Sequence, residues 1–128
     1  MPYQLEHLEQ RDIGRLAEES ACRHLQMHGL TLIDKNYRCK IGEIDLIMQD
    51  KEHVVFVEVR HRENNERGSG LESVDKRKMN KIIRTATLYL QDKEWLYKVH
   101  SRFDVISMLG PIHTAEIEWI KNAFTVDY

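Results

Sequence analysis

Acidic side chains interrupt two apolar segments of the chain, in positions where they could support metal-dependent chemistry. Glu43 and Asp45 lie in the first segment, and Glu58 lies in the second, two residues before Arg60. Two carboxylates that face each other repel and lose hydration, which costs stability unless a cation neutralises them. One or two carboxylates with water and a phosphate form the oxygen-rich site that suits Mg²⁺ or Mn²⁺. The other interpretation is a hairpin with a solvated acidic face, and the spacing alone leaves both open.

A β-hairpin is the element that would hold these acids together. Residues 43–48 and 54–60 have the composition of strands, and the polar residues 49–52 between them are typical of a turn. Side chains alternate between the two faces of a strand. The first strand should therefore present one face with Glu43, Asp45 and Ile47, and another with Ile44, Leu46 and Met48.

The register of this hairpin decides how close the two central acids lie. A turn centred near Asp50 and Lys51 places Asp45 opposite Phe56. Glu58 is then the diagonal neighbour of Asp45, roughly 7 to 8 Å away, which is a gap that one hard cation could bridge.

The chain before the hairpin predicts one helix and one strand. Apolar residues recur at helical spacing over about residues 5–28, and Gly29 is the expected stop of this first helix. Residues 30–33 form a short apolar run that predicts a strand, and the polar, basic residues 34–40 follow it.

The chain after the hairpin predicts a second helix and two strands. Residues 61–72 are typical of a mobile loop, and Ser73 is the expected cap of the helix. The buried stripe of this helix should comprise Met79, Ile82, Ile83, Ala86 and Leu90. Strands near 102–108 and 114–120 follow, joined by a turn at 110–111. The order α-β-β-β-α-β-β predicts an α/β fold, with a mixed central sheet flanked by two main helices.

Length and composition favour a single domain over residues 1–128, because 128 residues with 41% hydrophobic content can build one ordinary core. The net charge of -2 excludes a protein that binds nucleic acid by being basic all over. The N-terminus lacks the features of a signal peptide and no apolar run could span a membrane. Cys22 and Cys39 form no metal-binding motif and match the reduced thiols of a cytoplasmic protein.

The hairpin resembles the paired signature of the YraN family of predicted endonucleases, in residues 42–47 and 55–62. That family belongs to the PD-(D/E)XK nuclease-like superfamily and is similar to archaeal Holliday-junction resolvases. Further matches cover nearly the whole chain: Gly14, Ala17-Glu18, Asn36-Tyr37-Arg38, Val74-Asp75-Lys76, Arg102-Phe103-Asp104-Val105 and Asn122-Ala123-Phe124. The resemblance implies a single restriction-endonuclease-like, or resolvase-like, domain.

The resemblance also implies roles for individual residues. Asp45 matches the metal-binding aspartate, Glu58 matches the acidic residue of the (D/E)XK half-motif, and Glu18 matches the helix glutamate that completes the acidic cluster. With the Val59 carbonyl, Asp45 and Glu58 would hold Mg²⁺ or Mn²⁺ for phosphodiester hydrolysis in nucleic acid, with branched or structured DNA as the expected substrate. Arg60 stands where the superfamily usually has lysine; it can stabilise phosphate charge but cannot act as a base.

Basic residues flank the acidic hairpin and are the candidate phosphate contacts. Arg77, Lys81 and Arg84 follow one another at i, i+4 and i+7 on the second helix. The full set of candidates is Arg38, Lys40, Arg62, Lys76, Arg77, Lys81 and Arg84. A solvated helix face explains the stripe equally well. The alternatives to a nuclease are a nucleic-acid-binding module on the same fold without catalysis and, third, a scaffold that binds only proteins. A homodimer is the oligomer that small nucleases of the superfamily suggest.

Overall fold

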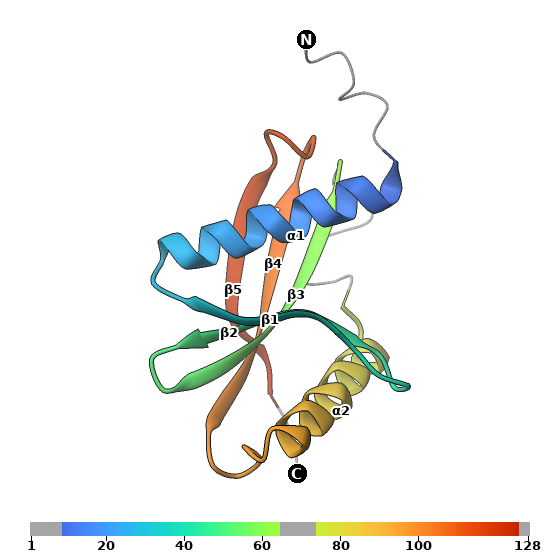
Figure 1. The fold of residues 1–128 in the computed structure, drawn as a ribbon. Coiled ribbons are helices and arrows are strands. Elements are labelled where there is room, and N and C mark those ends of the chain that lie inside the picture. The colour runs from blue at the N-terminus through green and yellow to red at the C-terminus, as the bar shows by residue number, and fades with distance from the viewer. Residues whose placement is uncertain (1–8, 65–73, 126–128) are drawn as a thin grey trace.

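Two helices and a five-stranded sheet make up the computed structural model, which describes residues 9–64 and 74–125 (Figure 1). In chain order the elements are α1 (Gln10–Met27), β1 (Thr31–Arg38), β2 (Glu43–Asp50), β3 (His53–Arg62), α2 (Lys76–Asp92), β4 (His100–Leu109) and β5 (Glu116–Phe124). This order confirms the predicted α/β fold.

The strands lie side by side in chain order, β1-β2-β3-β4-β5. Neighbours are antiparallel except β3 and β4, which run parallel because α2 crosses over between them. The two helices cover opposite faces of the sheet, as Figure 1 shows, and each seals its own apolar cluster. Burial on both faces explains why residues 54–57 of β3 are all apolar and all buried.

Helix α1 packs through small side chains and ends where the sequence predicts. Ala17, Ala21 and Leu25, spaced four residues apart, are buried in the cluster that includes Val55. Gly29 follows with φ of +95°, a conformation that favours glycine. The helix begins at Gln10, after the extended N-cap Glu9, and so starts later than the predicted residue 5; residues 5–8 themselves lie outside the described residues.

Helix α2 begins with a different cap from the one expected. The Asp75 carboxylate accepts a hydrogen bond from the backbone N–H of Lys78 at 2.9 Å, so Asp75 is the N-cap. Ser73 and the predicted loop at 65–72 lie outside the described residues, whereas residues 61 and 62 belong to β3. The buried face of α2 comprises Ile82, Thr85, Ala86, Tyr89 and Leu90, with Met79 and Ile83 partly buried beside it.

Strand β1 is longer than the predicted strand at 30–33, because the polar residues 34–38 also pair with β2. As an edge strand, β1 can expose alternate polar side chains to water, which masks its strand pattern in the sequence. A bulge between Leu32 and Asp34 shifts its register against β2.

The register predicted for the β2–β3 hairpin is wrong by two residues. Phe56 lies opposite Ile47 rather than opposite Asp45, and Asp50 pairs with His53 around the two-residue turn at 51–52. Lys51 takes a φ of 56° there, as such short hairpin turns require. The corrected register makes Asp45 and Glu58 the next opposed position after Leu46 and Val57.

The face predicted for Ile44 is also wrong. Ile44 and Ile47 belong to the cluster under α2, whereas Leu46 and Met48 belong to the cluster under α1. Ile44 lies beyond the last β2–β3 pair, Leu46 with Val57, so strict alternation is not maintained there. Departure from regular pairing therefore begins at Asp45, between the two isoleucines.

A buried aspartate, Asp104, links residues 102–105 of β4 with residues 122–124 of β5. Asp104, which is fully buried, accepts hydrogen bonds from Arg102, from the Trp119 ring N–H at 2.9 Å and from the Asn122 backbone N–H at 2.9 Å. These bonds span the register shift between β4 and β5. Residues 102–105 and 122–124 thus share a structural role, which is to hold β4 and β5 together.

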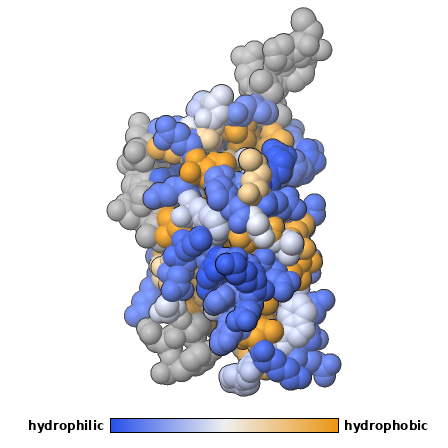
Figure 2. Space-filling view, turned by 90° about the vertical axis from the view of Figure 1, so that its left-hand side faces the viewer, coloured by the Kyte–Doolittle hydropathy of each residue, from blue (hydrophilic) through white to orange (hydrophobic). Residues whose placement is uncertain are grey.

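Polar side chains dominate the face shown in Figure 2, where hydrophobic residues form small separate areas. Large hydrophobic side chains that are exposed in the described residues are Met27, Leu32 and Tyr97. Neither described helix has the length and apolar character needed to cross a membrane.

Candidate functional site

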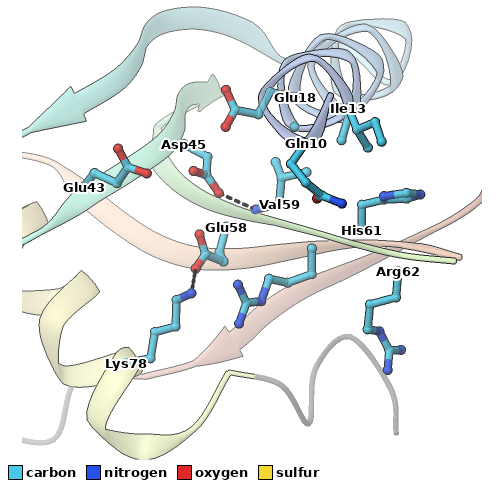
Figure 3. Close-up of a pocket in the computed structure, with 13 residues that line it drawn as sticks. Gln10, Ile13, Glu18, Glu43, Asp45, Glu58, Val59, His61, Arg62 and Lys78 are labelled. Atoms are coloured by element: carbon cyan, nitrogen blue, oxygen red, sulfur yellow. Dashed lines mark hydrogen bonds and ion pairs between the residues drawn. The ribbon is translucent and has the colours of Figure 1, made fainter. Parts of the chain in front are cut away.

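Asp45 and Glu58 lie where regular pairing between β2 and β3 stops, and each is only 8% exposed. They face a cavity of about 400 Å³ whose walls come from α1, β2, β3 and α2 (Figure 3). Asp45 Oδ2 accepts a hydrogen bond from the Val59 N–H at 2.8 Å, and Glu58 forms an ion pair with Lys78. We call this the acidic cavity.

The two central carboxyl groups are too close to carry two full charges in a dry site. Burial, followed by the hydrogen bond with Glu58 and the charge of Glu58, raises the pKa of Asp45 to about 9, against a smaller lowering by the Val59 N–H. Without a cation, Asp45 is therefore protonated at neutral pH, and its O–H can donate a hydrogen bond to Glu58.

Glu18 extends the same acidic group from α1, and Figure 3 shows its carboxylate directed toward Asp45. Burial raises the pKa of Glu18, and the charge of Glu43 adds to this rise, while a hydrogen bond with Asn36 opposes it. Asn36 reaches Glu18 from β1, where its φ of 54° lies in the left-handed region that asparagine tolerates.

The donor set fits a magnesium-type ion better than a softer metal. Among the described residues, no three His, Cys, Asp or Glu side chains are arranged to hold one ion. Mg²⁺ needs only one or two carboxylates, because water and substrate oxygens complete its shell. The N–H and C=O of a strand residue point to the same side, so the Val59 carbonyl faces Asp45 with the Val59 N–H.

A lysine that the sequence analysis missed completes the cavity. Lys78 Nζ lies 3.2 Å from Glu58 Oε2, and Figure 3 shows the side chain reaching from the first turn of α2 to the acids. The position of Lys78 in the sequence does not mark it as a site residue, since the neighbouring basic residues of α2 point elsewhere. The motif at 74–76 contains the N-cap Asp75, which fixes where α2 begins and therefore which way the Lys78 side chain points. This motif is the sequence feature from which the position of Lys78 could have been inferred.

Three predicted residues besides the acids also line the acidic cavity: Val59, Arg60 and Arg62. The Arg62 Nε and Nη1 groups are buried and have no hydrogen-bond partner in the described part of the chain. Gln10 and His61 line the cavity too and were not predicted. Their positions depend on the packing of α1 and on the bond between His61 Nε2 and the Gly110 carbonyl, at 2.7 Å.

The other predicted phosphate contacts do not line the acidic cavity. Arg38 is paired with Glu43 at 2.7 Å, and Lys40 is exposed beside the β1–β2 turn. Lys76 lines a separate groove with Met79 and Ile83. The stripe on α2 is exposed as predicted, and it comprises Arg77, Lys81 and Arg84.

A profile described as "Uncharacterised protein family UPF0102" matches residues 17–108, a span that holds all the acids of the cavity and Lys78. The chain belongs to UPF0102. A UPF0102 protein of Stutzerimonas stutzeri strain A1501 is 45% identical over 116 residues, covering 91% of this chain and 97% of the relative. A UPF0102 protein of Pseudomonas fluorescens is 46% identical over 112 residues, covering 87% and 91%.

A third UPF0102 relative, from Pseudomonas aeruginosa strain LESB58, is 44% identical over 120 residues, covering 89% of this chain and 93% of its own. Membership of UPF0102 confirms the resemblance to the YraN family at the level of the family. Assignment to the PD-(D/E)XK superfamily stays a prediction. The UPF0102 match ends within β4, so β5 lies outside the matched region.

Proposed function

We propose that this protein is a metal-dependent endonuclease that hydrolyses phosphodiester bonds in nucleic acid, with branched or structured DNA as the expected substrate. The observation that carries the proposal is the pairing of two buried carboxyl groups, Asp45 and Glu58, at the wall of an open cavity. A protein gains no stability from two such groups side by side, because burial penalises their charge. Binding of a cation is a function that accounts for this cost.

Asp45, Glu58 and the Val59 carbonyl are the residues that would hold Mg²⁺ or Mn²⁺. Such an ion supplies an activated water and polarises the phosphate that is cleaved. Asp45 would give up its proton to become a ligand, and the Val59 N–H would keep the carboxylate oriented. Glu18 lies beside Asp45 and would accept a hydrogen bond from water in the cavity.

Lys78 removes the main objection that the sequence raises against catalysis. Arg60 occupies the place of the usual lysine on β3, and a guanidinium cannot act as a general base. Lys78 brings an ammonium group to Glu58 from α2 instead, at 3.2 Å. In this role the Lys78 ammonium would donate hydrogen bonds to the phosphate, while Arg60 would stabilise the charge of the transition state.

Arg62 supports a phosphate contact at the edge of the acidic cavity. A buried N–H without an acceptor costs about 1–3 kcal/mol, and Arg62 carries two such groups in the described structure. A phosphate oxygen of the substrate would accept hydrogen bonds from these groups. This phosphate would belong to the bound DNA strand at some distance from the cleaved bond.

Replacement of Arg62 by methionine should separate substrate binding from folding. We expect unchanged or slightly higher stability without DNA, because the variant removes unpaired polar groups. DNA affinity should fall several-fold, and the slope of log affinity against log salt should decrease by about 1. Fluorescence anisotropy across a salt series measures both quantities, and an unchanged slope would remove Arg62 from the interface.

Cleavage assays on a panel of labelled DNAs test the proposed function. Four-way junctions, flaps, single strands and duplexes would be incubated with purified protein in Mg²⁺, in Mn²⁺ and in EDTA. We expect cleavage of a branched or flap substrate with either metal, none in EDTA, and none with Glu58→Gln. The matched control is Glu52→Gln, which changes an exposed acid in the β2–β3 turn and should cleave as wild type does.

Equal residual cleavage by wild type and Glu58→Gln would indicate contamination and contradict the proposal. The binding module without catalysis would then be favoured if the junction still binds, and both would be abandoned if it does not.

A further inference from the structure

A second cavity, of about 280 Å³, lies between α1 and β1 and shares Glu18 with the acidic cavity. We call it the α1–β1 cavity. Asn36, the hydrogen-bond partner of Glu18, also lines it, so the Glu18–Asn36 pair stands where the two cavities meet. A ligand that extends beyond the acidic cavity past Glu18 would therefore enter this second space.

Apolar side chains line part of the α1–β1 cavity. Leu46 is buried, whereas Leu32 is 39% exposed, which is unusual for a large aliphatic side chain in this protein. The bulge in β1 follows Leu32 directly. Water thus reaches an apolar surface beside the acidic cavity, and a flat apolar group could cover it.

Cations and amides surround this apolar surface. Arg15 and Arg23 line the cavity from α1 and Lys35 lines it from β1, and all three are exposed. Gln26 and Asn36 add amide groups that can both donate and accept hydrogen bonds. Glu18 and Glu19 are the acids that line the same cavity, so its charged side chains carry a net charge of +1.

We propose that the α1–β1 cavity binds one unpaired nucleotide of the strand whose backbone passes through the acidic cavity, an inference that rests on the proposed function. Arg23 and Lys35 contact the phosphate, Leu32 contacts the base, and the amides bond to the edge of the base. Ligand pockets commonly measure about 300–1,000 Å³, and 280 Å³ admits a single base but not a base pair. Apolar side chains are the usual surroundings of an extruded base. The substrate class is therefore DNA with an unpaired residue next to the cleaved bond.

Titration with a short ligand tests this cavity without any cleavage. The probe is the thymidine dinucleotide pTpT, added to ¹⁵N-labelled wild-type protein in EDTA and followed by amide chemical shifts. We expect changes concentrated at residues such as Cys22, Leu32 and Lys35. Arg23→Glu with Lys35→Glu should weaken binding at least tenfold, and Leu32→Ser should weaken it without any change of charge.

The matched control is Lys51→Glu with Lys98→Glu, which changes net charge equally at exposed lysines that line neither cavity. It should alter the affinity for pTpT less than twofold. Equal losses in the two double variants, or shifts spread over all basic surfaces, would mean general electrostatic attraction and would overturn the proposal.

Cleavage of flap DNA with one abasic residue, placed in turn at each position near the cut, separates this inference from the proposed function. We expect one position at which the abasic residue slows wild-type cleavage, with no such position in the Arg23→Glu, Lys35→Glu variant. A cleavage rate that no abasic position changes would be consistent with the proposed nuclease but would overturn the nucleotide site. Localised pTpT binding without cleavage of any DNA would instead retain the site and reject the nuclease.

Discussion

Asp45→Asn should make the metal-free protein more stable at neutral and alkaline pH while it removes cleavage. The asparagine oxygen can still accept the Val59 N–H, and its amide can donate to Glu58, as the protonated Asp45 does. The variant therefore resembles the neutral form of Asp45 at every pH. We expect a gain of about 2–4 kcal/mol in the free energy of unfolding at pH 8.

The sign of the pH dependence follows from the raised pKa of Asp45. An acid that holds its proton more tightly in the folded state stabilises the fold fully only below its unfolded pKa, near 3.8. This contribution falls as the pH rises from about 4 toward the folded value of about 9. The stability difference between Asp45→Asn and wild type should thus be near zero at pH 4 and grow to pH 9.

Urea unfolding in EDTA at several pH values measures this difference. Glu52→Gln is the matched control, since it neutralises an exposed acid that lines neither cavity and should change stability by less than about 0.5 kcal/mol. Added Mg²⁺ or Mn²⁺ should stabilise wild type and leave Asp45→Asn unaffected. An Asp45→Asn variant that is less stable than wild type, or a stability difference that does not change with pH, would contradict the raised pKa of Asp45.

Lys78→Met should reduce the cleavage rate by about 10²–10³ with little change in DNA affinity. The ammonium group lies at Glu58 rather than on the exposed basic stripe, so its loss should affect the reacting phosphate more than the binding of the remaining backbone. Lys78→Arg keeps the charge but replaces the compact ammonium with a larger planar group, and we expect it to restore only part of the rate.

Single-turnover cleavage and anisotropy measured on the same substrate separate the two effects. Lys93→Met, at the other end of α2, is the matched control because it removes an exposed lysine that lines neither cavity. Equal rates for Lys78→Met and Lys93→Met would show that Lys78 has no part in the reaction. Circular dichroism and the unfolding temperature would confirm that each variant is folded.

Elements other than β1 were predictable because they carry a local pattern in the sequence. Small apolar residues at helical spacing mark α1, and four consecutive apolar residues mark the centre of β3. The register of the β2–β3 hairpin was not predictable, because the polar residues 49–52 allow more than one turn. The actual turn places Lys51 in a left-handed conformation, which a lysine in the sequence does not predict.

The acids of the candidate site could be located from the sequence, but their surroundings could not. Asp45 and Glu58 stand out because charge is rare within buried strands. Lys78 has no such contrast, since it is one of several cations at the start of α2. Its approach to Glu58 depends on how α2 packs against the sheet, which is a long-range property of the fold.

From the parallel pairing of β3 with β4 we also expect a particular order of assembly of the site during folding. The β2–β3 hairpin closes around a two-residue turn, whereas β3 can pair with β4 only after the chain through α2 has folded back. Local hairpins form in microseconds, and nonlocal parallel pairs form far more slowly. We therefore expect the hairpin to bring the two acids together early, while they are still hydrated, and Lys78 to reach Glu58 later, when α2 packs on the sheet.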